Sequence, residues 1–363
     1  MKGTTVVCCI CCIAASLTAS ARGDTYLYGV SPDYAAGIGD AGYGPVMKLA
    51  RFDVDTESLT VYPVGMPSLY RWQYVLSFPS ADPNGNIHWL VGNAPSQPNQ
   101  LPPKLGLASF GTQSAGGYEL RSTGIAIDES LGAVLQFTVA DATRAYGLLQ
   151  YSLPEGVEFR LHEFSLSTGK ASPGTSLPGL MFGGMYTDAR WAYAGGLLYD
   201  IDWGEPWSMV RMDPTLAQPV TGKAAFPALM VPYSLTGLPN GRVFGWTEDM
   251  GQGLQLEEFR FLTPDTLAVT AIGKPFAPGL VDHYGTLTGG PDGKLYCSAV
   301  GGSYVLQIDP DTAAYTPLGG FPGGGPGAWD WSIYLGPAAI PEPATLSLLA
   351  LAGLALIARR KGR

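Results

Sequence analysis

The sequence predicts an all-β ectodomain, and a six-bladed β-propeller is the fold that fits it best. Its 363 residues include 49 Gly, 30 Pro, 19 Tyr and 8 Trp. Gly and Pro occupy turn positions, whereas Tyr and Trp are favoured in strands, so the composition indicates many short strands joined by tight turns. A repeat of about fifty residues also runs through the chain between its two ends.

In each copy of the repeat, an apolar strand is followed by a second strand that ends in an aromatic or apolar residue and a polar turn. The apolar strand is predicted at 86–91 in one copy and at 133–139 in the next. These strand-ending residues lie 58, 54, 48, 47 and 49 positions apart. They are Phe52, Phe110, Phe164, Met212, Phe259 and Ile308. Six units of this length match the four-stranded blades of a six-bladed propeller. Seven blades, and a β-sandwich or jelly roll, are the alternatives.

The phase of the repeat predicts how the ring closes. The first strand, at 26–30, takes the second position of a blade, and an unpaired strand at 330–335 is expected to supply the missing member. The pattern resembles six-bladed propellers of repeat-containing secreted proteins. The segments at 53–56 and 309–312 are expected to be turns capped by an Asp carboxylate, because a calcium loop needs more acidic oxygens at fixed spacing.

The N-terminus has the three parts of a secretory signal peptide. A basic start precedes an apolar stretch at 6–17, and Ala19 and Ala21 occupy the small positions of an A-x-A cleavage pattern. Residues 1–21 are therefore predicted to be removed after export through the Sec translocon. Four of the five cysteines lie in this segment, so the mature chain keeps only Cys297, which is expected to be buried and inert.

The C-terminus also has three parts. Pro341, Glu342 and Pro343 form a stiff, extended triplet, and an uncharged stretch of fifteen residues follows at 344–358. A helix of this length covers roughly 23 Å, short of a ~30 Å hydrocarbon core, and snorkelling of basic side chains makes up the difference. The basic residues that follow, and that are expected to stay in the cytoplasm, are Arg359, Arg360, Lys361 and Arg363.

This order of triplet, apolar segment and basic cluster resembles the PEP-CTERM sorting signal of exopolysaccharide-producing Gram-negative bacteria. Ile340 stands where the common form has Val. The resemblance implies processing by an exosortase, a membrane-embedded protease or transpeptidase. It divides the chain into a signal peptide (1–21), a propeller-like ectodomain (22–339) and a sorting signal with one transmembrane helix (340–363). A plain single-span anchor is the alternative.

The region between the two signals is acidic. Residues 22–340 hold 16 basic and 29 acidic side chains, a net charge of −13 with His neutral. This charge argues against nucleic acid and anionic lipid as partners of the ectodomain.

No catalytic or metal-binding motif is visible. His88, His162 and His283 share no ligand spacing, and no G-x-S-x-G elbow is present, so we expect no catalytic residue, no metal and no cofactor. The densest acidic and aromatic cluster is a candidate cation or sugar site, with its indoles as stacking platforms. It consists of Asp200, Asp202, Trp203, Glu205 and Trp207. A solvated strand end with core tryptophans is the competing interpretation.

Together these observations predict an exported, surface-sorted, non-catalytic binding or structural protein of the exopolysaccharide or biofilm matrix. The C-terminal helix is expected to anchor it in the inner membrane until exosortase processing sends it to the cell surface or medium. The alternatives are a six-bladed hydrolase or lyase acting on a carbohydrate, and a propeller that binds other proteins.

Overall fold

The structure is a computed structural model that describes a large part of the ectodomain. The described residues are 25–38, 45–66, 80–92, 104–111, 118–126, 130–182, 191–227, 232, 234–249, 253–281, 287–299, 305–319 and 337–339. The predicted signal peptide, the predicted strand at 330–335 and the C-terminal tail lie outside these ranges. Within them, no helix has the length and apolar character needed to span a membrane.

The described secondary structure is made of β-strands. They are β1 (Thr25–Ile38), β2 (Pro45–Asp53), β3 (Ser58–Met66), β4 (Ser80–Ala81), β5 (Asn86–Gly92), β6 (Lys104–Gly111), β7 (Tyr118–Ala126), β8 (Leu131–Val139), β9 (Arg144–Leu153), β10 (Gly156–Ser165), β11 (Thr175–Ser176), β12 (Ala192–Ala194), β13 (Leu197–Asp202), β14 (Ser208–Met212), β15 (Val220–Ala225), β16 (Ser234–Gly237), β17 (Val243–Asp249), β18 (Gly253–Thr263), β19 (Thr266–Ile272), β20 (Thr288–Gly289), β21 (Leu295–Ser298), β22 (Val305–Ile308), β23 (Tyr315–Pro317) and β24 (Pro337–Ala339).

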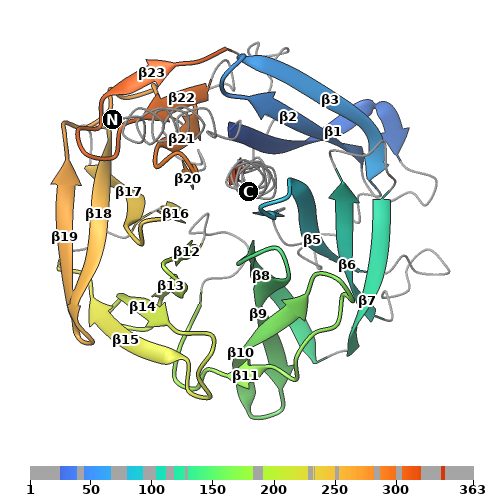
Figure 1. The fold of residues 1–363 in the computed structure, drawn as a ribbon. Coiled ribbons are helices and arrows are strands. Elements are labelled where there is room, and N and C mark those ends of the chain that lie inside the picture. Colours follow the sequence, from blue (N-terminus) through green and yellow to red (C-terminus); the bar gives the residue numbers. More distant parts are fainter. Residues whose placement is uncertain are drawn as a thin grey trace, which may run out of the picture.

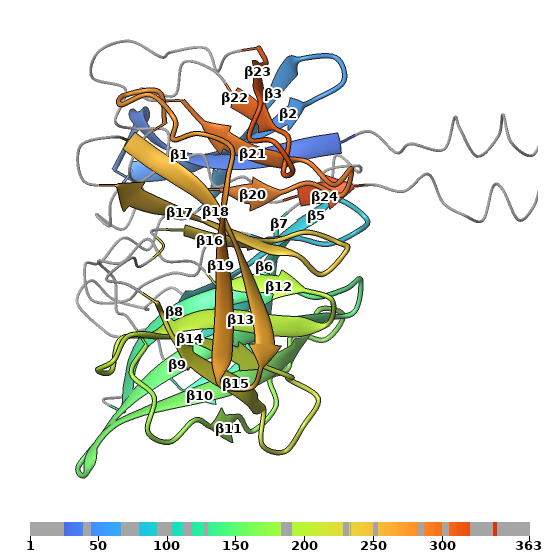
Figure 2. The same cartoon turned by 90° about the vertical axis from the view of Figure 1, so that its left-hand side faces the viewer.

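Among the described residues these strands form six four-stranded antiparallel sheets arranged in a ring (Figure 1). In five sheets the strands follow chain order from the centre outward, as in β16-β17-β18-β19. Figure 2 shows the ring from the side, with β18 and β19 on its outer surface. The predicted all-β, propeller-like architecture is confirmed.

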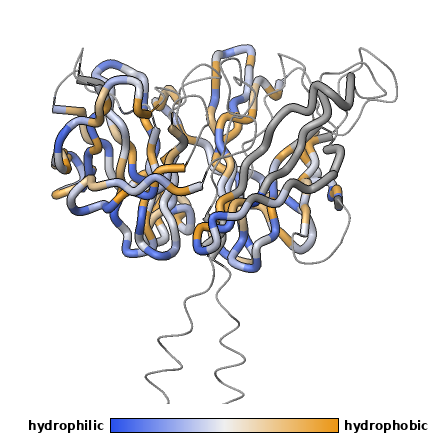
Figure 3. The backbone as a smooth tube through the Cα atoms, turned by 90° about the horizontal axis from the view of Figure 1, so that it is seen from above, coloured by the Kyte–Doolittle hydropathy of each residue, from blue (hydrophilic) through white to orange (hydrophobic). Residues whose placement is uncertain are grey.

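The core lies between neighbouring sheets. Each described hydrophobic cluster takes its residues from two sheets that are adjacent in the ring. In one of them, Leu90 and Leu107 of the β4–β7 sheet pack with Phe137 and Phe164 of the β8–β11 sheet. A sheet covered on both sides is buried on both faces, which explains the near-continuous apolar runs of its strands. Figure 3 shows hydrophobic stretches along the strands and hydrophilic stretches at many turns.

The strand-ending residues of the sequence repeat occupy equivalent places in the ring. Each lies in the third strand from the centre of its sheet and is buried. The six positions are Phe52 in β2, Phe110 in β6, Phe164 in β10, Met212 in β14, Phe259 in β18 and Ile308 in β22. The repeat therefore reports a real structural period.

One copy of the repeat was assigned incorrectly from the sequence. The segment 133–139 was placed as the strand equivalent to 86–91, but it belongs to β8, the innermost strand of its sheet. The equivalent second strand is β9, which the sequence analysis missed. The tight turn after β8, in which the Asp141 carboxylate accepts the Thr143 and Arg144 amides at 2.8 and 2.9 Å, makes β9 a direct hairpin partner.

The remaining sheet joins the two ends of the ectodomain, in the order β24-β1-β2-β3. Thr25 of β1 lies opposite Ala339 of β24, and Leu27 lies opposite Pro337. β24 also contacts β4, the innermost strand of the next sheet. A C-terminal strand was expected to complete the first sheet, and the described one is β24, two residues beyond the predicted segment at 330–335.

The segment at 309–312 forms the predicted Asp-capped turn. Oδ1 of Asp309 accepts the backbone amides of Asp311 at 3.0 Å and Thr312 at 3.1 Å. The hydrogen bond from Lys294 Nζ to Asp309 Oδ2 is 2.6 Å long. This bond, together with those inside the turn, outweighs burial and lowers the pKa of the Asp309 carboxyl to about 2.

The turn at 53–56 has the same construction, and both turns end in a strained residue. Oδ1 of Asp53 accepts the amides of Asp55 and Thr56 at 3.0 Å each. The next residue, Glu57, has φ of 51°, and its counterpart Ala313 has φ of 56°. Residues with a Cβ rarely adopt this left-handed conformation, whereas Gly adopts it freely.

Replacing the exposed Glu57 by Gly is expected to raise the free energy of unfolding by up to about 1 kcal/mol, because it removes the left-handed strain. Glu57→Ala is the matched control, since it removes the same carboxylate but keeps the Cβ. Urea unfolding of the purified ectodomain measures both. Equal stability of the two variants would show that the strain at this turn is negligible.

Candidate functional site

The predicted acidic and aromatic cluster lies at the end of β13 and in the loop to β14. Asp202 is fully buried there. Its Oδ1 accepts the backbone amides of Met181 at 2.8 Å and Gly204 at 3.0 Å, and its Oδ2 forms an ion pair with Lys223. The carboxylate thus fastens two chain segments to the strand end, and its charge is compensated inside the protein.

Asp200 is buried on the same side of β13. Its neighbour on that side, Leu198, belongs to the core shared with the β8–β11 sheet. Oδ1 of Asp200 accepts the amide of Ile201 at 2.7 Å, and Oδ2 has no hydrogen-bond partner among the described residues. Burial, reinforced by the charge of Asp202, raises the pKa of the Asp200 carboxyl to about 8. Asp200 is therefore mainly protonated at neutral pH.

The loop residues of this cluster are more accessible. The Trp203 and Trp207 rings meet edge to face, with centroids 5.4 Å apart and planes inclined at 67°. Trp203 packs on the core between the β12–β15 and β16–β19 sheets, whereas Trp207 is 39% exposed and Glu205 is also exposed. The structure thus brings the two indoles together but places the two Asp carboxylates beneath the surface.

The buried proton on Asp200 has a consequence for stability. Below about pH 4 both the folded and unfolded states are protonated. Between pH 4 and 8 the unfolded state loses the proton that the folded state keeps, so stability falls as pH rises, by at most about 1.4 kcal/mol per pH unit. Asp200→Asn carries no such proton, and we expect it to become increasingly more stable than the natural chain between pH 5 and 8.

Thermal unfolding at pH 5, 6, 7 and 8 measures this difference. The matched control is Asp202→Asn, which loses the ion pair with Lys223 and is expected to be less stable than the natural chain. A constant difference between Asp200→Asn and the natural chain across the series would contradict a protonated Asp200.

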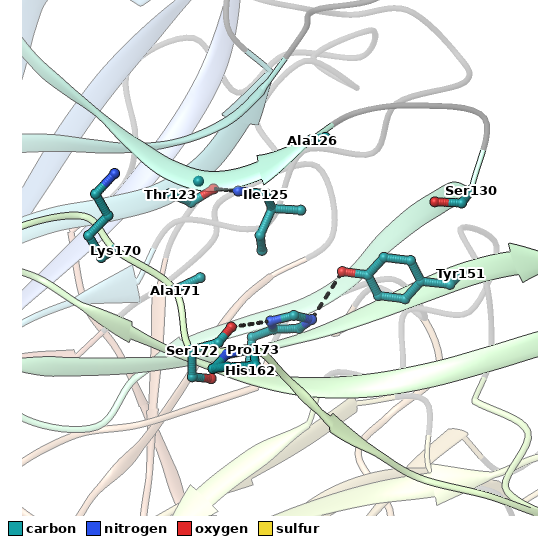
Figure 4. A pocket seen from close by; sticks show the side chains of 11 residues that line it. Thr123, Ile125, Ala126, Ser130, Tyr151, His162, Lys170, Ala171, Ser172 and Pro173 are labelled. Carbon is teal, nitrogen blue, oxygen red and sulfur yellow. Dashed lines mark hydrogen bonds between the residues drawn. The ribbon is translucent and has the colours of Figure 1, made fainter.

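A pocket that the sequence analysis did not predict lies between the β4–β7 and β8–β11 sheets. Its volume is about 490 Å³ (Figure 4), within the range of small-molecule sites. The end of β7 forms one wall, and β9, β10 and the segment after β10 form the other. The lining residues are Thr123, Gly124, Ile125, Ala126, Ser130, Tyr151, His162, Lys170, Ala171, Ser172 and Pro173.

His162 is the most constrained side chain of the pocket. Its Nδ1–H donates to the carbonyl oxygen of Ser172 at 3.0 Å, and its Nε2 accepts from the Tyr151 hydroxyl at 3.1 Å (Figure 4). Burial lowers its pKa, and the Ser172 carbonyl only partly opposes this. Gly174 lies against the ring, where a Cβ would approach within 2.4 Å. The imidazole is thus neutral and held in one tautomer.

The pocket walls are tied together across the junction of the two sheets. The amide of Ala171 donates to the Thr123 carbonyl at 3.0 Å, and the Thr123 hydroxyl donates to the Leu105 carbonyl at 2.6 Å. The exposed Lys170 lies on the rim (Figure 4). The pocket therefore combines apolar walls, a fixed His–Tyr pair and an exposed ammonium donor.

Asp82, His88 and Ser109 form a buried chain that has the residue types of a catalytic triad. His88 Nδ1 lies 2.8 Å from Ser109 Oγ, and His88 Nε2 lies 3.3 Å from Asp82 Oδ2. All three side chains are at most 8% exposed. Asp82 also caps the β4–β5 turn by accepting the amides of Asn84 at 2.8 Å and Asn86 at 2.9 Å.

The hydrogen bonds around Asp82 indicate a structural role for this row of three side chains. Burial tends to raise the pKa of the Asp82 carboxyl, but hydrogen bonds from His88 and Asn86 outweigh it and lower the pKa. A nucleophilic Ser must reach its substrate, whereas Ser109 is enclosed in the sheet. The three hydrogen-bonded side chains fasten the β4–β5 turn to β5 and β6.

The other sequence-predicted groups are placed as follows. Cys297 is a free, buried thiol, and burial raises its pKa. His283 lies outside the described residues, as do the predicted signal cleavage site and the sorting triplet. Within the described ranges, no group of three or more His, Cys, Asp or Glu side chains is placed to hold a metal ion.

No local sequence pattern indicates the pocket. Its walls come from two sheets, and Thr123 meets residue 171 only because β7 and the end of β10 lie side by side in the ring. Of the lining residues, only His162 had been singled out from the sequence.

Comparison with known protein families assigns residues 339–361 to the PEP-CTERM protein-sorting motif. The resemblance inferred from Pro341, Glu342 and Pro343 is confirmed. The motif implies recognition by an exosortase, and export with a membrane-anchored sorting signal. No curated protein matches the chain.

Several solved structures are similar to this chain at low identity and with TM-scores below 0.5. A chain of a nidogen/laminin complex is 14% identical, covering 82% of this chain and 94% of its own, with a TM-score of 0.45. Virginiamycin B lyase from Staphylococcus aureus is 12% identical, covering 82% and 85%, with a TM-score of 0.41. A fungal alcohol oxidase is 12% identical, covering 83% and 63%, with a TM-score of 0.47. Similarities at this level say nothing about activity.

Proposed function

We propose that this is an exported, surface-sorted, non-catalytic binding protein that an exosortase releases from its membrane anchor. The observation that carries the proposal is the sorting motif at 339–361, which begins at the final residue of β24, the last described strand of the propeller-like ectodomain. Export through the Sec translocon, followed by signal-peptide cleavage after Ala21, and a transient transmembrane helix at 344–358 complete the route. We further infer that each four-stranded sheet is one blade, which makes a six-bladed propeller.

The ligand that we propose is a saccharide of low charge in the extracellular polysaccharide matrix. The acidic ectodomain repels polyanions, whereas a neutral sugar meets no such barrier. The pocket beside His162 has a suitable volume, apolar walls at Ile125 and Pro173, and an exposed ammonium donor at Lys170. Trp207 and Glu205, which belong to the cluster named from the sequence as a candidate sugar site, are an alternative platform on another sheet.

A carbohydrate-acting hydrolase or lyase is the second candidate. The Asp82, His88 and Ser109 chain is the observation in its favour, because it holds a hydroxyl against an imidazole. We favour the binding protein, because Ser109 is buried and Asp82 is engaged in a turn.

The fate of the tail tests the sorting proposal. Intact-mass analysis of protein fractionated from the native host is expected to show a mature C-terminus near Pro343, with the protein outside the inner membrane. A full-length C-terminus retained in the inner membrane would contradict exosortase processing and leave an anchored periplasmic protein.

Binding of matrix polysaccharide tests the ligand proposal. Lys170→Ala is expected to weaken the affinity roughly tenfold, because it removes a charged hydrogen-bond donor at the pocket rim. Lys274→Ala, which changes an exposed lysine on another sheet, is the matched control and should bind normally. Isothermal titration calorimetry of the purified ectodomain measures the affinities.

The same titration separates the alternatives. Loss of affinity in Trp207→Ala, with normal binding by Lys170→Ala, would move the site to the loop after β13. Absence of binding by the natural ectodomain would contradict the association with polysaccharide.

A further inference from the structure

The strand that closes the ring ends where the sorting motif begins. β24 spans Pro337–Ala339 and supplies the innermost strand of its sheet. The PEP-CTERM match starts at residue 339, so Ala339 belongs both to the sheet and to the sorting signal. Pro341, the first residue of the triplet, is only two positions further, which is at most roughly 7 Å along an extended chain.

The backbone of β24 has one edge paired with β1 and another at the centre of the ring, where β24 contacts β4. On the first edge, Ala339 is paired with Thr25, and Pro337 with Leu27. A protease that reads an extended peptide by strand addition needs a free and accessible strand edge, and in the closed ring one edge of β24 is occupied and the other is enclosed by the innermost strands. Since Pro341 favours an extended residue before it, an enzyme-bound triplet continues naturally into β24. Pairing with β1 and capture by such an enzyme therefore exclude each other.

β24 is able to leave while the rest of its sheet stays folded. Three residue pairs join β24 to β1, whereas nine join β1 to β2. Pro337 also has no N–H to contribute. Leu27 in β1 and Phe52 in β2 pack in the core shared with the β20–β23 sheet, and this packing does not depend on β24. Local opening of a short terminal strand needs no global unfolding.

We propose that the exosortase captures the tail only when β24 is detached from β1, so that this single junction of the ring controls processing. The proposal rests on the exosortase processing proposed above. A ring that is still open after translocation is the substrate, and a closed ring is protected. Hydrolysis then breaks one peptide C–N bond, with the hydroxyl of water added to the carbonyl carbon and the proton to the departing amine.

A disulfide across the junction tests the proposal. Residues paired in an antiparallel sheet have Cα atoms about 4.5–5.5 Å apart, within the range that a disulfide bridges, so Thr25→Cys with Ala339→Cys is expected to lock β24 onto β1. In a pulse-chase in the native host, intact mass reports both the bond, by loss of two hydrogens, and removal of the tail. The locked form should be processed at least about tenfold more slowly, because cleavage follows the population of the open form.

Two further variants make the result specific. Thr25→Cys alone is the matched control and should be processed at the natural rate. A flexible spacer of about eight Gly and Ser residues between Ala339 and Ile340 gives the enzyme a free strand, so it should restore processing to the locked ring. Unchanged processing of the locked form would overturn the coupling. If the natural chain and the spacer variant both keep their tails, the proposed function fails and the coupling fails with it.

Discussion

The face-to-face packing of neighbouring sheets is the constraint on which the rest of this structure depends. The described apolar clusters lie between adjacent sheets. The first sheet also contacts the next one through the innermost strands β24 and β4. Because each sheet covers the faces of its neighbours, a ring that lacked one whole sheet would leave two apolar faces in water. Joining β24 to β1 places the first and last strands of the ectodomain in one sheet and completes the ring.

This packing also determines what the buried polar residues do. Asp202 fastens a loop and pairs with Lys223, and Asp82 caps a turn while holding His88. A polar group between packed sheets must be hydrogen-bonded inside the protein, so most residues with catalytic potential are committed to the fold. Asp200 is the exception among these acids, because burial keeps it protonated. The pocket that we propose as the binding site lies beside His162, between two neighbouring sheets.

Ala339 belongs both to the closing strand of the ring and to the sorting motif. The same short segment completes the ring and leads into the sequence that the exosortase reads. The coupling that we propose would link the state of the fold to release from the membrane without an additional domain. The N-terminal end of the fold takes part in the same junction, because Thr25 is the partner of Ala339 in the sheet. Thr25 lies four residues after the predicted signal cleavage at Ala21.

The sequence by itself determined the local features of this protein. The sorting signal, the Asp-capped turns and the repeat marked by residues such as Phe52 and Ile308 depend on neighbouring residues and their period, so they were readable without coordinates. The sequence analysis missed β9, because only a short hairpin turn separates this strand from β8. Only the tertiary structure decided that Asp200 and Asp202 lie beneath the surface, that Thr123 meets the segment after β10, and that β24 pairs with β1. Such contacts join residues far apart in the chain, and they exist because the ring brings separate sheets together.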